Sequence, residues 1–168
     1  MKNGEALPKS INDCLANYLE KHKELITASW VERVRNSLAV PTASMTRPEI
    51  IDHIPDIFDA IIRALRQPLS ETAMEQIQET SSEHVVVRWQ TGYDLYAVLR
   101  EIAALRIEFI YQLRLFEETH PEFAMTQRLF ASTTIHGILD YIICDGTDKF
   151  LKLTQGKPIK RLTKRSVS

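Results

Sequence analysis

Apolar residues recur at helical spacing along almost the whole chain. The first series runs from Ile11 to Leu38, with apolar positions three or four residues apart, and a second stripe runs from Ile50 to Leu65. A period near 3.6 residues is typical of amphipathic helices, which turn one apolar side toward a core. A further helix is predicted over 71–90, after a turn at 67–70.

The second half of the chain carries the two longest apolar series. The first predicts a clean helix over 93–118, and the second predicts a helix over 122–153. The last helix is apolar on more than one side, which indicates burial on most sides. It is therefore predicted to be the central helix of a bundle or a helix that also serves a subunit interface. Because such surplus apolar surface usually marks an interface, the chain is predicted to form a homodimer.

Capping residues and a proline mark helix ends. Thr46 and Glu49 have the spacing of a capping box. Pro55 lies inside the second stripe, and because proline lacks a backbone N–H it is expected to kink or split that helix. The whole pattern predicts an all-α helical bundle of five or six helices, with the last two forming the core. It forms one domain over 1–156, followed by a basic polar tail or linker over 157–168.

Composition narrows the classes of function. The chain has 168 residues and a net charge of -1, which fits one globular domain without a basic field for nucleic acid. No apolar run reaches the roughly 18 residues of a membrane span, and the N-terminus lacks the apolar core of a signal peptide. Cys14 and Cys144 have no metal-type spacing. We therefore expect a cytoplasmic protein with two reduced thiols, a disulfide between them being the alternative, and no nucleic-acid or membrane partner.

The motifs of common catalytic and metal sites are missing. Helical di-iron sites use Glu-x-x-His, which the chain lacks, and Glu49 with His53 forms a single pair four residues apart. There is no Gly-rich phosphate loop, Gly-x-Ser-x-Gly or local Cys-His signature. Three histidines flank apolar stripes where a haem ligand could stand, but a lone histidine there is more often a core residue. They are His53, His84 and His136. We expect no enzymatic activity, no metal and no cofactor.

Polar residues on two predicted helices form the most distinctive pattern. His84, Arg88 and Gly92 follow one another at intervals of four, so they lie along one side of a helix. Arg106 falls in the middle of the apolar stripe of the next helix. A buried arginine keeps its charge, so Arg106 is expected to point into the bundle and meet a carboxylate or a polar cavity near His84 and Arg88. The candidate acids lie on the proline-containing helix: Asp52, Asp56 and Asp59. The group is then either a structural ion pair or a pocket for an anionic signal.

These residues resemble the N-terminal sensor domain of RsbR/RsbRD-type stress regulators, the RsbT co-antagonist N-terminal domain also found in some histidine kinases. The main block is His84-x-x-x-Arg88-x-x-x-Gly92-Tyr93, followed by Leu99-Arg100-Glu101 and Leu105-Arg106. Two further blocks are Ala28-Ser29-Trp30-Val31 and the segment 50–59, which contains Asp52, His53 and Asp56. The ordered set covers about residues 10–155. One departure is Ile102, at a position where the family often has an aromatic residue.

The resemblance implies a helical, globin-like domain without haem that dimerises and sits upstream of a STAS domain or a histidine kinase. It implies signal input rather than turnover, with the segment 157–168 as the start of a linker to the output domain. The nominated signal pocket or structural polar cluster is His84, Arg88, Gly92, Tyr93, Glu101, Arg106, His53, Asp52 and Asp56. The alternative is a haem-binding or small-molecule-binding globin-like protein.

Overall fold

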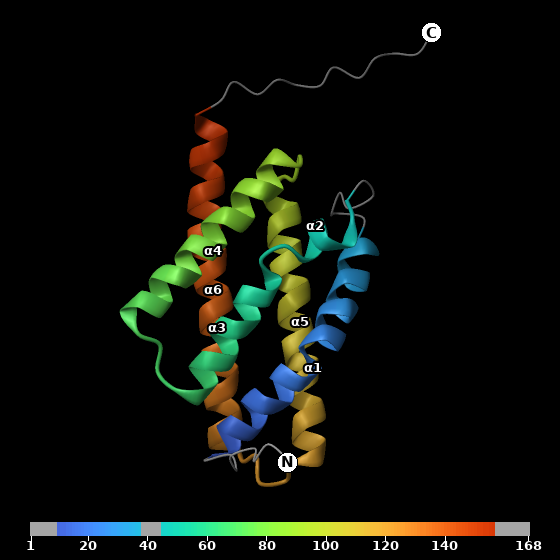
Figure 1. The fold of residues 1–168 in the computed structure, drawn as a ribbon, viewed down its shortest axis with the longest axis vertical. Helices are drawn as coiled ribbons and strands as arrows, with labels where there is room; N and C mark the ends of the chain where they lie inside the picture. The colour runs from blue at the N-terminus through green and yellow to red at the C-terminus, as the bar shows by residue number, and fades with distance from the viewer. Residues whose placement is uncertain (1–9, 38–44, 157–168) are drawn as a thin grey trace, which may run out of the picture.

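The structure is a bundle of α-helices. The computed structural model describes residues 10–37 and 45–156, and none of these residues forms a strand. In chain order the helices are α1 (Ile11–Arg35), α2 (Arg47–Ile51), α3 (Ile54–Arg66), α4 (Glu71–Gln90), α5 (Leu95–Thr119) and α6 (Met125–Gln155) (Figure 1). The predicted all-α class is confirmed. The predicted tail over 157–168 lies outside the described residues.

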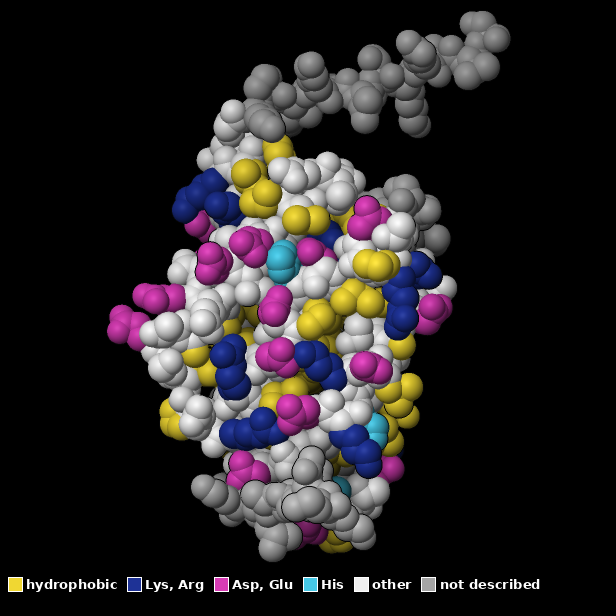
Figure 2. Space-filling view, viewed as in Figure 1, with side chains coloured by type: hydrophobic (Ala, Val, Ile, Leu, Met, Phe, Trp, Pro, Cys, Tyr) yellow, Lys and Arg dark blue, Asp and Glu magenta, His cyan; other side chains and the backbone are white. Residues whose placement is uncertain are grey.

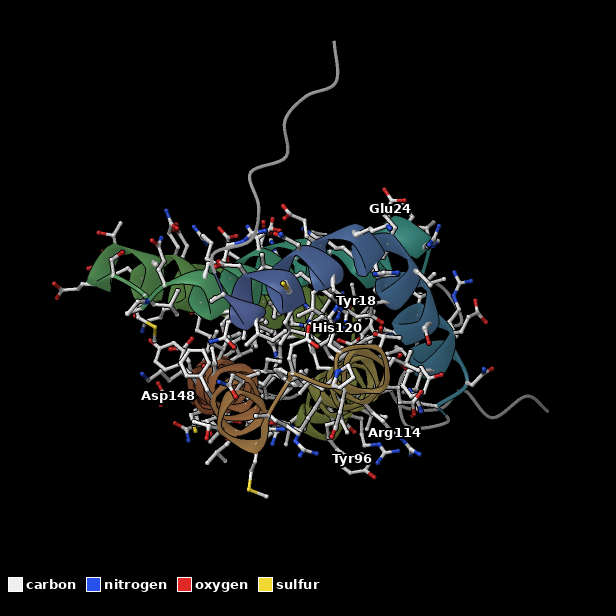
Figure 3. The ribbon with its side chains drawn as sticks, turned by 90° about the horizontal axis from the view of Figure 1, so that it is seen from below. Tyr18, Glu24, Tyr96, Arg114, His120 and Asp148 are labelled. Atoms are coloured by element: carbon white, nitrogen blue, oxygen red, sulfur yellow. The ribbon has the colours of Figure 1, made fainter. Side chains whose placement is uncertain are left out.

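The helices stack in two layers. Seen from below, α1, α3 and α4 lie on one side, and α5 and α6 lie on the other (Figure 3). α1 packs on both α3 and α5, whereas α4 packs mainly on α6. Aromatic side chains join the layers, as with Phe58 of α3 and Phe109 of α5, whose ring centroids are 4.8 Å apart. The core therefore lies between the layers, where each helix turns one apolar side inward.

Local capping chemistry sets most helix starts. Ser10, Ser70 and Asp94 each accept a hydrogen bond from the backbone amide three residues later, which satisfies one of the free amides at a helix N-terminus. The predicted capping box is present at α2, where the Thr46 amide donates to Glu49 Oε2 at 2.7 Å. Glu49 is thus a capping residue.

The predicted interruption at Pro55 splits the second stripe into two helices. α2 ends at Ile51 and α3 begins at Ile54, with the proline in the first turn of α3. There its missing N–H costs no hydrogen bond. Between the helices Asp52 takes a positive φ of 39°, which is rare for a residue with a side chain.

Within the single chain α6 is not buried on most sides, so the prediction of a central helix is wrong, whereas a helix that also serves a subunit interface stays a prediction. Of its 31 residues, seven are buried, whereas α5 buries 11 of 25. Leu129 and Phe130 of α6 are exposed, because α6 packs on α4 and α5 and leaves its other side open. The core is shared by α1, α3 and α5, with α6 along its edge. Among the described residues no helix combines the length and hydropathy needed to cross a membrane.

Candidate functional site

Five polar side chains meet inside the bundle, and we call them the polar cluster: Asp52, His84, Arg88, Tyr93 and Glu101. Asp52 comes from the α2–α3 junction, His84 and Arg88 from successive turns of α4, Tyr93 from the α4–α5 turn, and Glu101 from α5. The side chains of Arg88 and Glu101 are 0% exposed and that of His84 is 1% exposed. Residues this polar are seldom so buried unless they are paired, so their partners decide what the cluster does.

Glu101 lies at the centre of the polar cluster. Its Oε2 accepts a hydrogen bond from Arg88 Nε at 2.7 Å, and its Oε1 accepts one from the Tyr93 hydroxyl at 2.9 Å. His84 Nε2 lies 3.3 Å from the same Oε2, an ionic contact without the alignment of a hydrogen bond. The carboxylate is therefore held by α4 and by the α4–α5 turn at once.

Arg88 also caps α2. Its Nη1 donates to the carbonyl oxygen of Glu49 at 2.9 Å, and its Nη2 donates to that of Ile50 at 2.6 Å. These carbonyls belong to the last turn of α2, where no intrahelical partner is available and positive charge is favoured. The guanidinium also lies 5.3 Å from the centre of the Tyr93 ring, a cation–π contact.

Asp52 connects the buried part of the polar cluster to the surface. Its Oδ2 is 3.3 Å from His84 Nδ1 and 3.8 Å from Arg88 Nη1. Its Oδ1 is 3.4 Å from Nε2 of His53, which is partly exposed. His53 in turn faces Asp56 at 3.7 Å and Glu83 at 3.9 Å. Figure 2 shows acidic side chains gathered around a histidine over the α2–α3 junction. The positive φ at Asp52 is thus held by contacts on both sides.

The charges of the polar cluster balance. Burial alone would lower the pKa of His84, but its contacts with Asp52 and Glu101 outweigh burial and raise the pKa. Burial would raise the pKa of Asp52 and of Glu101, but His84 and Arg88 hold both pKa values below their ordinary range. When His84 is protonated, two cations face two anions. Burial, followed by the charge of Glu101, raises the pKa of Tyr93, so its hydroxyl stays a neutral donor.

The structure brings most of the nominated residues together. Gly92 supplies a φ of 89° in the α4–α5 turn, where the chain reverses between Arg88 and Tyr93, and such a φ favours glycine. His53 borders the polar cluster through Asp52, whereas Asp56 is exposed and faces His53 rather than the cluster. Asp59 lies outside the group, because it pairs with Lys23.

The prediction for Arg106 is wrong. Its guanidinium pairs with Asp140 of α6, with the two side chains 30% and 60% exposed. It does not reach the polar cluster or the acids at 52, 56 and 59. The arginine lies at the edge between α5 and α6, where its charged end reaches water. No signal pocket around Arg106 and Arg88 follows from these contacts, since both guanidinium groups have partners.

Sequence reasoning also missed several partners. The indole N–H of Trp30 donates to the backbone carbonyl of Glu101 at 3.0 Å, which ties α1 to the polar cluster. Arg33 pairs with Glu108, whose side chain is 1% exposed and which lies about two helical turns beyond Glu101 on α5. The signal that could have found Glu108 is its spacing of seven residues from Glu101, which places both carboxylates on one side of α5.

The partners of the polar cluster all come from within the chain. Both ring nitrogens of His84 face carboxylates, so neither is free to bind iron. The void beside His84 has a volume of about 10 Å³, room for a single water at most. Within the described ranges no group of three or more His, Cys, Asp or Glu is arranged to hold a metal ion. No family model, curated protein or solved structure matches the chain.

Proposed function

We propose that this chain is a cytoplasmic sensory or regulatory domain of a bacterial stress-response or two-component signalling protein. It is of the RsbR/RsbRD type, globin-like and without haem, and it acts by dimerisation and by relaying a signal to a STAS or kinase output domain. One observation carries the proposal. The residues that form the ordered motif, His84, Arg88, Tyr93 and Glu101, lie scattered over 18 positions of sequence and meet in one cluster, whose charges are balanced together with Asp52.

The placement of the polar cluster suits a relay. A buried ion pair is weak evidence for stability, because apolar residues of similar volume often serve as well. A regulatory domain needs an element with two arrangements, and buried charge networks are one way to bias such an element. Here the polar cluster joins the α2–α3 junction to α4. α4 then packs closely on α6, where a Cβ added at Gly146 would lie 3.0 Å from Val85 Cγ2.

The outer side of α5 and α6 supports the homodimer. Large exposed apolar side chains gather on these two helices: Tyr96, Ile107, Ile110, Tyr111, Met125, Leu129, Phe130 and Leu151. Tyr96 and Arg114 point away from the α1–α3–α4 layer (Figure 3). An exposed apolar surface of this kind is typical of a protein interface, and a second copy would pair the two helices as a four-helix arrangement.

A chimaera tests the proposal. The chain is fused ahead of a histidine-kinase catalytic core, and autophosphorylation is measured for Tyr93→Phe and for the matched control Tyr141→Phe. Tyr93→Phe removes the hydroxyl that donates to Glu101 without stranding a charge, so the fold should survive while kinase output changes several-fold. Tyr141, half-buried on α6, should behave as wild type. Equal output from all three chimaeras, with unchanged circular dichroism, would contradict a relay through the polar cluster.

A further inference from the structure

α3 and α4, joined by the short turn after Arg66, border a cleft of about 630 Å³, which we call the α3–α4 cleft. Apolar side chains from both helices contribute to its lining, including Ile57, Ala60 and Ile77. The size is in the range of sites that hold a small ligand or a stretch of peptide. The cleft is thus a formed depression in the bundle.

The α3–α4 cleft is strongly acidic. Five carboxylates line it against two arginines: Glu20, Asp56, Asp59, Glu79 and Glu83 against Arg63 and Arg66. Glu20 and Asp59 have basic partners, but within the part of the chain that the structure describes no lysine or arginine pairs with Asp56, Glu79 or Glu83. The charge of the cleft is therefore only partly balanced from within.

The acidic wall extends along α4. Glu71, Glu75, Glu79 and Glu83 recur at every fourth residue and are all exposed. Figure 2 shows acidic side chains at the outer edge of the molecule over the N-terminal half of α4. Like charges four residues apart weaken their own helix. A basic partner in the cleft would remove this repulsion.

A second depression leads from α6 to the cleft. It has a volume of about 370 Å³, and its lining includes Lys149 of α6, Val86 and Val87 of α4, and His53. Glu83 lines both depressions, so they meet at that residue. An apolar path bordered by acid therefore runs from the last turns of α6 to the α3–α4 cleft.

The chain itself contains a segment of matching chemistry. Residues 157–168 follow directly on α6 and carry five basic residues and no acid: Lys157, Lys160, Arg161, Lys164 and Arg165. Ile159 and Leu162 alternate with these charges. We propose that the segment 157–168 docks in the α3–α4 cleft of its own chain, with its basic residues on the acidic walls and its apolar residues on the floor.

The distances allow this docking. Asp145 of α6 bonds Gln78 and Ser82 of α4, so α6 at that level lies beside the α4 wall of the cleft. Gly156 follows 11 residues later, which is about 16 Å along a helix. Twelve extended residues span up to about 40 Å. The docking does not depend on the proposed sensory role, but in that role it would make the position of the linker depend on α3 and α4.

Limited proteolysis of the full chain tests the docking, because trypsin cuts after lysine and arginine and a docked segment is protected. The Glu79→Gln/Glu83→Gln variant should be cleaved within 157–168 several-fold faster than wild type. It keeps the side-chain lengths and relieves repulsion in α4, so its fold is not at risk. The matched control is Glu118→Gln/Glu122→Gln, two exposed acids outside the cleft, which should be cleaved as wild type. Salt at about 0.5 M should raise the cleavage rate of wild type to that of the Glu79→Gln/Glu83→Gln variant.

Binding of a synthetic peptide gives the second measurement. The receptor is the full chain with its five tail lysines and arginines changed to Gln, and the probe is a peptide of residues 157–168. Methyl signals of Ile57 and Ile77 should shift on addition of the peptide and return with salt. Equal cleavage rates in all variants, or unshifted methyl signals, would overturn the proposal. Protection that increases with protein concentration would also overturn it, since the segment would then come from a second copy.

Discussion

At the scale of single residues, Glu101 is the most constrained group of the molecule. Its carboxylate accepts from Arg88 and Tyr93 and faces His84, while its backbone carbonyl accepts from Trp30. Each partner comes from a different turn or helix, so one side chain fixes several elements relative to one another. Removing its charge would leave Arg88 buried with Asp52, 3.8 Å away, as its remaining acidic partner.

Glu101→Gln is therefore expected to destabilise the fold by about 3–5 kcal/mol, the usual cost of breaking a buried ion pair on one side. Urea unfolding followed by circular dichroism measures the free energy of unfolding. The control is Glu118→Gln, an exposed residue near the end of α5, whose change should stay within about 0.5 kcal/mol of wild type. A small effect at Glu101 would show that the cluster is held by its backbone contacts alone.

The shifted pKa values of the polar cluster predict a pH dependence. The pKa of His84 is raised above its ordinary 6.5, so its contribution is complete below that pH and is lost as pH rises through the folded-state pKa. The pKa values of Asp52 and Glu101 are lowered below 3.8 and 4.5, so their contributions are complete above those values and are lost on further acidification.

Stability is therefore expected to be greatest between pH 4.5 and 6.5, the interval in which all three contributions are present. The melting temperature of wild type, recorded from pH 4 to 9, should fall on the alkaline side of this interval. The His84→Gln variant should have a lower melting temperature than wild type in mild acid, and its melting temperature should fall much less than that of wild type as the pH rises. Parallel curves for the two proteins would contradict the assignment of the decline to His84.

The residue scale also shows what the sequence could and could not reveal. The four-residue spacing of His84 and Arg88 placed them on one side of α4, as the structure has them. The position predicted for Arg106 was wrong because α5 carries apolar residues that are exposed, such as Ile107 and Ile110, beside those that are buried. Arg106 lies in the middle of all these apolar residues, but it lies at the edge of the buried ones, where its side chain reaches solvent. Asp52 was among the candidate acids and does contact His84 and Arg88, but no spacing rule indicates the positive φ with which it does so.

At the scale of elements, the contact of α4 with α6 depends on one missing side chain. Gly146 is buried, and a Cβ there would lie 3.0 Å from Val85 Cγ2 and 3.6 Å from Ser81 Oγ. Val85 is itself buried and β-branched, so it has few rotamers with which to give way. The Ser81 hydroxyl donates to the carbonyl of Ile142 in the same contact. Close approach of the two helices therefore requires glycine at 146.

Gly146→Ala is expected to destabilise the protein by about 1–3 kcal/mol, the usual cost of overpacking, less the gain in helix propensity. The matched test is a double-mutant cycle with Val85→Ala, which opens the space that the new Cβ needs. In that background the substitution should cost much less, as measured by urea unfolding. An equal cost in both backgrounds would mean that the strain lies elsewhere than in the contact with Val85.

Helix boundaries were more predictable than helix burial. The capping box at Thr46 and the break at Pro55 follow from chemistry within a few residues, and both are present in the structure. The burial of α6 depends instead on which helices lie around it. The apolar pattern of its sequence does not show whether an apolar side packs on another helix or is left open. This is why the same apolar residues that suggested a central helix lie on the outside of the bundle.

At the scale of the whole molecule, the proposed homodimer rests on the open side of α5 and α6. Ile110 is 50% exposed in the middle of this side. If two copies pair there, Ile110→Glu places a charge in an apolar interface and should give the mass of a monomer in light scattering, where wild type gives a dimer. Leu25→Glu is the matched control, because Leu25 of α1 is 66% exposed in the other layer, and it should remain a dimer. A monomeric wild type at micromolar concentration would contradict the proposed assembly.

The hydrogen bond from Trp30 to the Glu101 carbonyl makes Trp30 an intrinsic fluorescent probe of the polar cluster. The indole is fully buried, and its N–H points at the backbone of the residue whose carboxylate holds the polar cluster. Emission from a buried indole shifts with the fields and the water around it. A Trp89→Phe background would leave Trp30 as the single tryptophan of the chain. The colour of its fluorescence would then report any rearrangement around Glu101 in real time, without a label and in the intact protein.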